Sequence, residues 1–326
     1  MKKTFTLGTL ALAMLILPSA VQAQAVPTFT NPTDYNNYIV NEQRLLLRKN
    51  LRYISKSAHS DNEKKIEARR LDVVKQNELA LARLAKLKAY EGDVDFKENA
   101  TDALLMQLKV YSEDYKNVDF LAATRTQSFE NMEQYFRAME IAEAKLQAVG
   151  DSVDAAQKRF AKRHKLTITR DKETEELDKY IEAVAVVNAY QHKVYLAQFR
   201  IEKASARVGD AMSAQDVAAF GEARKQLAED AKNALADLAV IPAFRGKDTQ
   251  YRDATRNLVS FYAGLASNQF VKMEGLLDHK DSLTKEEAKE FNGYIAYYNA
   301  NSQKLNQAYN QAANNFQATY IPVFND

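Results

Sequence analysis

Apolar residues recur every three or four positions along two long stretches of the chain, which we call the seams. The first seam follows Ser128 and ends at Phe160, and the second ends at Phe316 with Ser302 as its only polar member. This spacing places the side chains on one face of an α-helix that packs nearly parallel to its neighbours. The first seam comprises Met132, Tyr135, Met139, Ala142, Leu146, Val149, Val153, Ala156 and Phe160, and the second comprises Ala288, Phe291, Ile295, Tyr298, Ser302, Leu305, Tyr309, Ala312 and Phe316.

The rest of the chain also favours helices, so we predict an all-α fold. Prolines stand only at positions 18, 27, 32, 242 and 322, so none interrupts the stretch from 33 to 241. Thr33 after Pro32, Ser60 with Asp61, and Thr284 with Glu287 are typical of helix starts, and Gly92, Gly209 and Gly246 are typical of helix ends. The expected helices span 33–58, 61–90, 96–124, 128–165, 172–208, 214–240, 250–279 and 284–319.

Two loops indicate an internal duplication. Each runs from a glycine through polar residues to an aromatic, a basic and an acidic residue, as GDVDFKE at 92–98 and GKDTQYRD at 246–253. Gly246 follows Gly92 by 154 residues, and Phe316 follows Phe160 by 156. We therefore predict two tandem up-down four-helix bundles, at 33–166 and 172–326, joined by a linker at 167–171. The alternative is a continuous elongated helical rod with the fourth and fifth helices end to end, which the poor helix formers in LTITR at 166–170 disfavour.

The N-terminal residues 1–23 have the plan of a secretory signal peptide. Lys2 and Lys3 precede the apolar run LGTLALAMLILPSA, and small residues follow up to Ala23. We expect cleavage after Ala23 or Ala25, and an exported linker at 24–32. The chain contains no cysteine. Export of such a chain fits the periplasm or cell surface of a Gram-negative bacterium.

The charge balance argues against polyanionic partners. The chain has 45 basic and 43 acidic residues, and Lys2 and Lys3 leave with the signal peptide. A balanced chain has no long-range field for nucleic acid or an anionic membrane, so we expect no nucleic-acid partner. We also expect no transmembrane segment in the mature chain.

The sequence offers no arrangement typical of catalysis, so we predict a protein that is not an enzyme and has no catalytic residues, cofactor or metal. No histidine has the Glu-x-x-His partner of di-iron bundles, and no serine stands in a Gly-x-Ser-x-Gly elbow. We interpret His279 with its neighbouring aspartates, and His59 with Asp61 and Glu63, as solvated turns rather than cation sites.

Three groups of residues are candidates for interaction. Arg159, Lys162 and Arg163 form a basic run that either meets an anionic partner or ends a solvated helix. Tyr294 and Tyr297 lie off the second seam among Asn and Gln residues, and either bind a peptide or glycan or pack against the first helix of the bundle. Phe244, Arg245 and Lys247 lie in the second loop and either contact a partner or cap the bundle.

The exported, helical plan resembles the uncharacterised "family surface protein" group of spirochaetes and Bacteroidetes-like bacteria. The signal peptide, the Tyr-rich stretch YNNYIVNEQRLLLRKNLRYI at 35–54 and the repeated loop element carry this resemblance, which spans most of the mature chain. It implies an exported protein and no particular ligand residues. We expect a binding or scaffolding role toward an envelope or surface protein or a glycan. Alternatives are a small-ligand or metal-binding bundle, with Glu42, Gln191 and Gln198 around a cavity, and a lipid-interacting protein using Arg159, Lys162 and Arg163.

Overall fold

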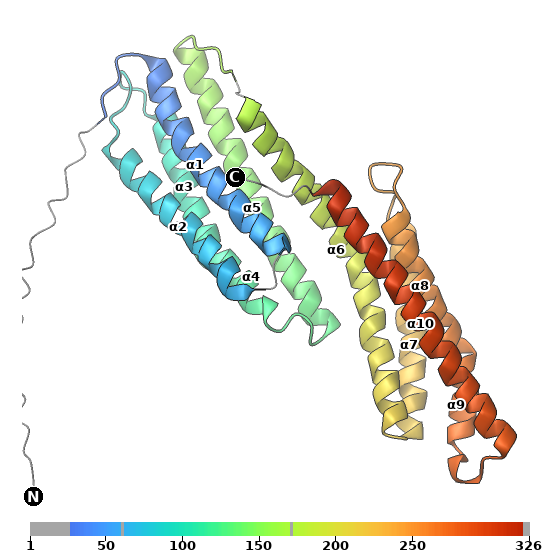
Figure 1. Cartoon of the computed structure of the whole chain (residues 1–326). Helices are drawn as coiled ribbons and strands as arrows, with labels where there is room; N and C mark the ends of the chain where they lie inside the picture. Colours follow the sequence, from blue (N-terminus) through green and yellow to red (C-terminus); the bar gives the residue numbers. More distant parts are fainter. Residues whose placement is uncertain (1–26, 60–61, 170–171, 322–326) are drawn as a thin grey trace, which may run out of the picture.

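The computed structural model describes residues 27–59, 62–169 and 172–321, and its regular structure there is helical throughout (Figure 1). The predicted signal peptide, 1–23, lies outside these residues, as does the last part of the predicted second bundle, 322–326. The helices are α1 (Pro32–His59), α2 (Glu63–Lys86), α3 (Asp95–Lys109), a π-helical turn (Val110–Asp114), α4 (Tyr115–Ala122), α5 (Phe129–Arg163), α6 (Lys172–Ser213), α7 (Val217–Val240), α8 (Gln250–Ser267), α9 (Gln269–Leu277), a 3-10 turn (Lys280–Ser282) and α10 (Lys285–Tyr320).

Most helix starts follow the local sequence signals. Thr284 and Glu287 form the predicted capping box at the start of α10, and Ser128 accepts a bond from the backbone of Asn131 at the start of α5. The N-cap of α2 is Asn62, whose side chain accepts from the backbone N–H of Lys65. Ser60 and Asp61, which we predicted for this start, lie outside the described residues.

Several expectations about the extent of the helices were wrong. Gly209 lies inside α6, which continues to Ser213. The predicted helix 96–124 is interrupted by the π-helical turn at Val110–Asp114, and the predicted helix 250–279 breaks at Asn268. A glycine costs a helix only about 1 kcal/mol, so packing in the core carries α6 past Gly209.

The helices gather around two hydrophobic cores. One core is built by α1 to α5 and includes Phe96, Leu104 and Phe160. The other is built mainly by α6 to α10 and includes Phe220, Leu258 and Phe316. Figure 1 shows the two groups side by side, the first from blue to green and the second from yellow to red. All members of both seams are buried or half-buried, as predicted.

Helix α6 belongs to both groups. It contacts α5 and α1 as well as α7, α8 and α10, and Leu51 of α1 lies in the core of the second group. The ring of Phe136 on α5 stacks on His192 of α6, with ring centroids 3.9 Å apart. Residues 166–169 are not helical, and α6 contacts α5 along its side, which disagrees with the alternative of a continuous rod with the two helices end to end. Arg170 lies outside the described residues.

No helix within the described ranges combines the length and the apolar character that a bilayer span requires.

Candidate binding site at two matched tips

An aromatic cluster closes one end of the first group of helices. Tyr35, Tyr90 and Phe96 surround the ring of Phe160, with centroid distances of 5.3, 6.1 and 5.6 Å. His164, one turn beyond Phe160, lies 4.4 Å from that ring. We call this cluster, with the loop from Leu87 to Asp95, the first tip.

The second group carries the same cluster at an almost constant distance along the chain. Tyr190, Phe244 and Tyr251 surround the ring of Phe316, at 5.3, 4.9 and 5.5 Å. Tyr320, one turn beyond Phe316, lies 5.1 Å from it. We call this cluster, with the loop from Ile241 to Gln250, the second tip. Each ring follows its counterpart in the first tip by 154 to 156 residues.

Each tip loop contains a turn with two consecutive residues of positive φ. These are Glu91 and Gly92 in the first loop, with φ of 50° and 84°, and Arg245 and Gly246 in the second, with 50° and 75°. Two consecutive residues in the left-handed region are typical of a type I′ β-turn, which favours glycine at the second position. The glycines predicted to end helices therefore shape these turns instead.

Two arginines of α5 hold the first loop. Arg163 donates from Nε and Nη2 to Asp93 at 2.6 and 2.9 Å, and Arg159 donates in the same forked way to Asp95 at 2.9 Å. The hydrogen bond from Arg159 is the main reason why the pKa of Asp95 is lowered to about 2. Burial alone would raise the pKa of Asp93, but bonds from Arg163 and His164 outweigh it and lower that pKa.

At the corresponding place, the second tip has a small polar pocket. It is lined by Asp248, Gln250, Tyr251, Ala312, Asn315, Phe316 and Thr319, and its empty space measures ≈ 210 Å³, part of it open to solvent. The counterparts of Asn315 and Thr319, 156 residues earlier, are Arg159 and Arg163. The two guanidinium groups of the first tip therefore have no counterpart in the second tip, where the pocket is open to solvent.

The residues predicted for the second loop lie at this tip but differ in exposure. Phe244 is only 3 % exposed and packs in the aromatic cluster. The prediction that this residue contacts a partner directly was therefore wrong. Its alternative role, capping the bundle, agrees with this position. The guanidinium of Arg245 lies 5.4 Å from the ring of Phe244 and 5.3 Å from that of Tyr320. Arg245 and Lys247 are exposed.

The predicted basic run is divided between two roles. Arg159 and Arg163 hold the first loop, while Lys162 is exposed. The sequence did not reveal this pairing, because the aspartates stand more than 60 residues away. The nearly equal spacing from Asp93 to Arg163 and from Asp248 to Thr319, 70 and 71 residues, was a signal available under the predicted duplication.

Tyr294 and Tyr297 lie on α10 next to side chains of the second group. Lys272 stands 5.7 Å from the ring of Tyr294, whose hydroxyl donates to Glu290. Tyr297 is 46 % exposed and its ring lies 6.0 Å from that of Phe261.

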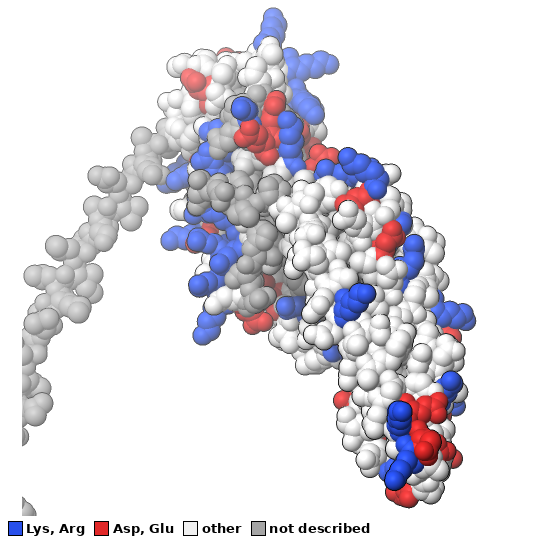
Figure 2. Space-filling view, turned by 45° about the vertical axis from the view of Figure 1, so that its right-hand side comes forward, with Lys and Arg blue, Asp and Glu red and all other residues white. Residues whose placement is uncertain are grey.

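Between Phe291 and Tyr320, α10 carries a single charged residue, Lys304. Figure 2 shows a broad area of the second group without charged side chains.

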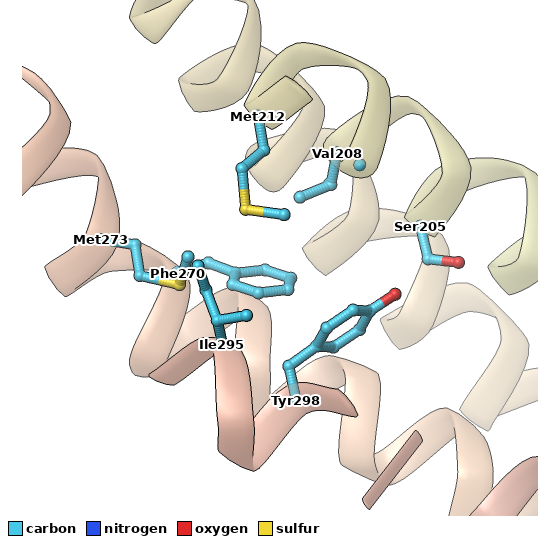
Figure 3. A pocket seen from close by; sticks show the side chains of 8 residues that line it. Ser205, Val208, Met212, Phe270, Met273, Ile295 and Tyr298 are labelled. Carbon is cyan, nitrogen blue, oxygen red and sulfur yellow. The ribbon is translucent and has the colours of Figure 1, made fainter. Parts of the chain in front are cut away.

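A second, apolar hollow lies between α6, α9 and α10 (Figure 3). Val208, Met212, Phe270, Ile295 and Tyr298 line it with Ser205, Gly209 and Met273, around ≈ 270 Å³ of empty space that is partly open to solvent. The hollow exists because α6 has Val208 and Gly209 where α1 has Tyr53 and Ile54, 155 residues earlier. Its walls are mainly apolar, and its enclosed space is no larger than a water molecule, so it offers no room for a ligand.

The residues predicted to line a ligand cavity have structural partners instead. Glu42 pairs with Arg83 of α2 at 3.1 Å, and Gln198 donates to Glu202 one turn further along α6. Gln191 is half-buried on α6. His279 Nε2 lies 3.4 Å from Glu287 Oε1. Within the described residues no three His, Asp or Glu side chains come together as metal ligands would.

No protein-family model, no curated protein and no solved structure matches the chain.

Proposed function

We propose that this chain is an exported, non-enzymatic protein that binds or scaffolds another component of a Gram-negative envelope or cell surface. Its architecture, in this proposal, is two tandem four-helix bundles that arose by duplication, with the boundaries predicted from the sequence. The partner is an envelope or surface protein or a glycan, and the second bundle presents the contact surface.

Matched interactions support the duplication. Arg70 of α2 donates to Asp119 at 2.7 Å and to the backbone oxygen of Tyr111 at 3.0 Å. Arg224 of α7 donates to Glu274 at 2.6 Å and to the backbone oxygen of Ala266 at 3.2 Å. These pairs are 154 or 155 residues apart. Unlike a shared heptad pattern, which any two helices can imitate, a repeated arginine with the same two kinds of acceptor supports common ancestry of the halves.

The observation that carries the binding function is the difference between α5 and α10. On α5, Phe136 and Glu143 face α6, where they meet His192 and Asn188. Their counterparts on α10 are Asn292 and Asn299, 156 residues later, and both are exposed. A helix face that covers a neighbour in one half is uncovered in the other, and its amides suit a hydrogen-bonding partner.

In vivo photocrosslinking tests this proposal. A photoreactive residue replaces Gln303, which is exposed on the uncovered face of α10. In the matched control, the photoreactive residue replaces Gln147, the exposed counterpart of Gln303 on α5. We expect a discrete crosslinked product, identified by mass spectrometry as an envelope protein or glycan conjugate, at Gln303 and not at Gln147. Lys247, on the loop of the second tip, is a third site for the photoreactive residue. The proposal would be contradicted if the mature protein is correctly exported but gives no crosslinked product, or equal products, at all three sites.

A further inference from the structure

Asp93 and Asp248 hold equivalent positions in the two tips. Oδ1 of each accepts from the backbone N–H two residues further on, at 3.2 Å for Asp93 and 3.0 Å for Asp248. Oδ2 of each is bonded by the side chain one turn beyond the central Phe, at 3.0 Å from His164 and 2.9 Å from Tyr320. The two carboxylates therefore have the same local partners and the same orientation toward their loops.

Only Asp93 has a further partner. It accepts the forked pair of bonds from Arg163, whereas no Lys or Arg in the described ranges forms an ion pair with Asp248. A carboxylate has about four acceptor positions, and the two local bonds use two of them. The remaining positions on Asp248 thus correspond to those that Arg163 occupies on Asp93.

The surroundings of Asp248 leave room for the missing group. The counterparts of Arg159 and Arg163 are the shorter Asn315 and Thr319, and the pocket that they line is open to solvent at the tip. Gln250 lines the same pocket in place of Asp95, so a neutral acceptor replaces the second carboxylate.

We propose that the second tip binds the guanidinium group of an arginine side chain supplied by a protein partner. Asp248 accepts a forked pair of hydrogen bonds, as Asp93 does from Arg163, and Gln250, Asn315 and Thr319 provide further polar contacts. The first tip is filled by arginines of its own chain, and the second takes its arginine from outside.

The other charges near this pocket favour arginine over lysine. Arg245 and Lys247 lie on the same loop, with Arg252 and Asp253 at the start of α8. Two cations on the loop weaken the general attraction for any positive charge. Recognition then depends on hydrogen-bond geometry, which the planar fork of a guanidinium satisfies and a compact ammonium does not.

This inference deepens the proposed binding function and rests on it. The test is an NMR titration of the full mature chain with acetyl-Gly-Gly-Arg-Gly-Gly-amide, against peptides with lysine or citrulline at the central position. We expect the arginine peptide to shift the amide signals of Gln250 and Asn315 with a Kd of about 1 mM, and the citrulline peptide at least 10-fold more weakly. Equal shifts from the arginine and citrulline peptides would overturn the proposal.

Variants of the pocket provide a second test. Asp248→Asn should weaken arginine binding at least 10-fold, whereas Asp93→Asn in the first tip should not change it. The triple variant Gln250→Asp, Asn315→Arg, Thr319→Arg rebuilds the first tip in the second, and we expect it to fold with an unchanged or higher Tm and to lose arginine binding. A folded triple variant that binds the peptide as the native chain does would overturn the proposal.

The two proposals fail separately. Capture of an envelope partner at Gln303 without arginine binding at Asp248 would remove only the arginine site. Selective arginine binding without any captured partner would leave the site and remove the proposed envelope function.

Discussion

At the scale of single residues, the contact between α5 and α6 contains two titratable side chains with opposite responses to burial. Burial raises the pKa of Glu143 to about 7, although a hydrogen bond from Asn188 counteracts it. Burial lowers the pKa of His192 to about 4. Glu140 lies 3.9 Å from His192 Nδ1, but a histidine with this pKa is neutral at pH 7, so we do not regard the two as an ion pair.

These shifts predict a stability that changes little with pH because two trends cancel. The folded state holds the proton of Glu143 more tightly than the unfolded state, so this residue lowers stability as pH rises from about 4.5 to about 7. The unfolded state binds the proton of His192 more tightly, so this residue raises stability as pH rises from about 4 to about 6.5. Each contribution is at most about 3 kcal/mol.

Urea unfolding between pH 4 and 8 separates the two effects. In Glu143→Gln, the free energy of unfolding should rise relative to the native chain as pH increases from 4.5 to 7. His192→Phe keeps an aromatic ring against Phe136. In this variant, the free energy of unfolding should fall relative to that of the native chain as pH increases from 4 to 6.5. Profiles of both variants that run parallel to that of the native chain would show that these residues titrate normally.

At the scale of elements, the two irregular helices, α3 to α4 and α8 to α9, each meet an arginine that is buried in the first group and half-buried in the second. The π-helical turn begins at Val110, and Arg70 donates to the backbone oxygen of Tyr111. The break between α8 and α9 lies at Asn268, and Arg224 donates to the backbone oxygen of Ala266. An interrupted helix leaves carbonyl groups without their usual partners, and a side-chain donor can satisfy them.

Arg224→Met should therefore destabilise the second group. It removes the bonds to Glu274 and Ala266, and hydrogen bonds of charged groups contribute about 1.5–3 kcal/mol, so we expect a loss of about 2–3 kcal/mol in unfolding free energy. Chemical denaturation measures the loss. Because Glu274→Gln weakens the same contact, the double variant should lose less than the sum of the two single variants. Additive losses would show that the pair does not stabilise the fold.

The same elements show what the sequence could predict. The seams and the capping box depend on neighbours within four residues, so helix positions were predictable from Phe160, Phe316 and Thr284. The interruptions of the third helices and the arginine contacts at the first tip depend on residues 40 to 70 positions away, which local patterns do not record. Phe244 was misjudged for the same reason: its loop position suggested exposure, but Tyr190 and Phe316 bury it.

At the scale of the whole molecule, the two cores are linked through α1, α5 and α6. Leu51 of α1 is 0 % exposed in the second core, and Tyr180 near the start of α6 interacts with Ser55 of α1. Neither group therefore buries its apolar surface entirely with its own helices. We expect the groups to stabilise each other.

Leu51→Ala tests this link. We expect a loss of about 2–5 kcal/mol, typical of leucine removal from a core, and faster amide hydrogen exchange in α1 and in α7 and α8. The matched control is Leu104→Ala, which is equally buried but lies in the first core, and its effect on exchange should be concentrated in α1 to α5. Exchange in α7 and α8 that is unchanged by Leu51→Ala would mean that the second group is independent of α1.

The uninterrupted course of α6 also has a mechanical consequence. A helix of 42 residues is about 63 Å long at 1.5 Å per residue. Between Tyr180 and Arg200 the helix contacts α1 and α5, while along its length it also packs against α7, α8 and α10. Any small tilt of α6 where it rests on the first group is amplified with distance, so α6 acts as a lever arm that swings the far end of the second group through a wider arc.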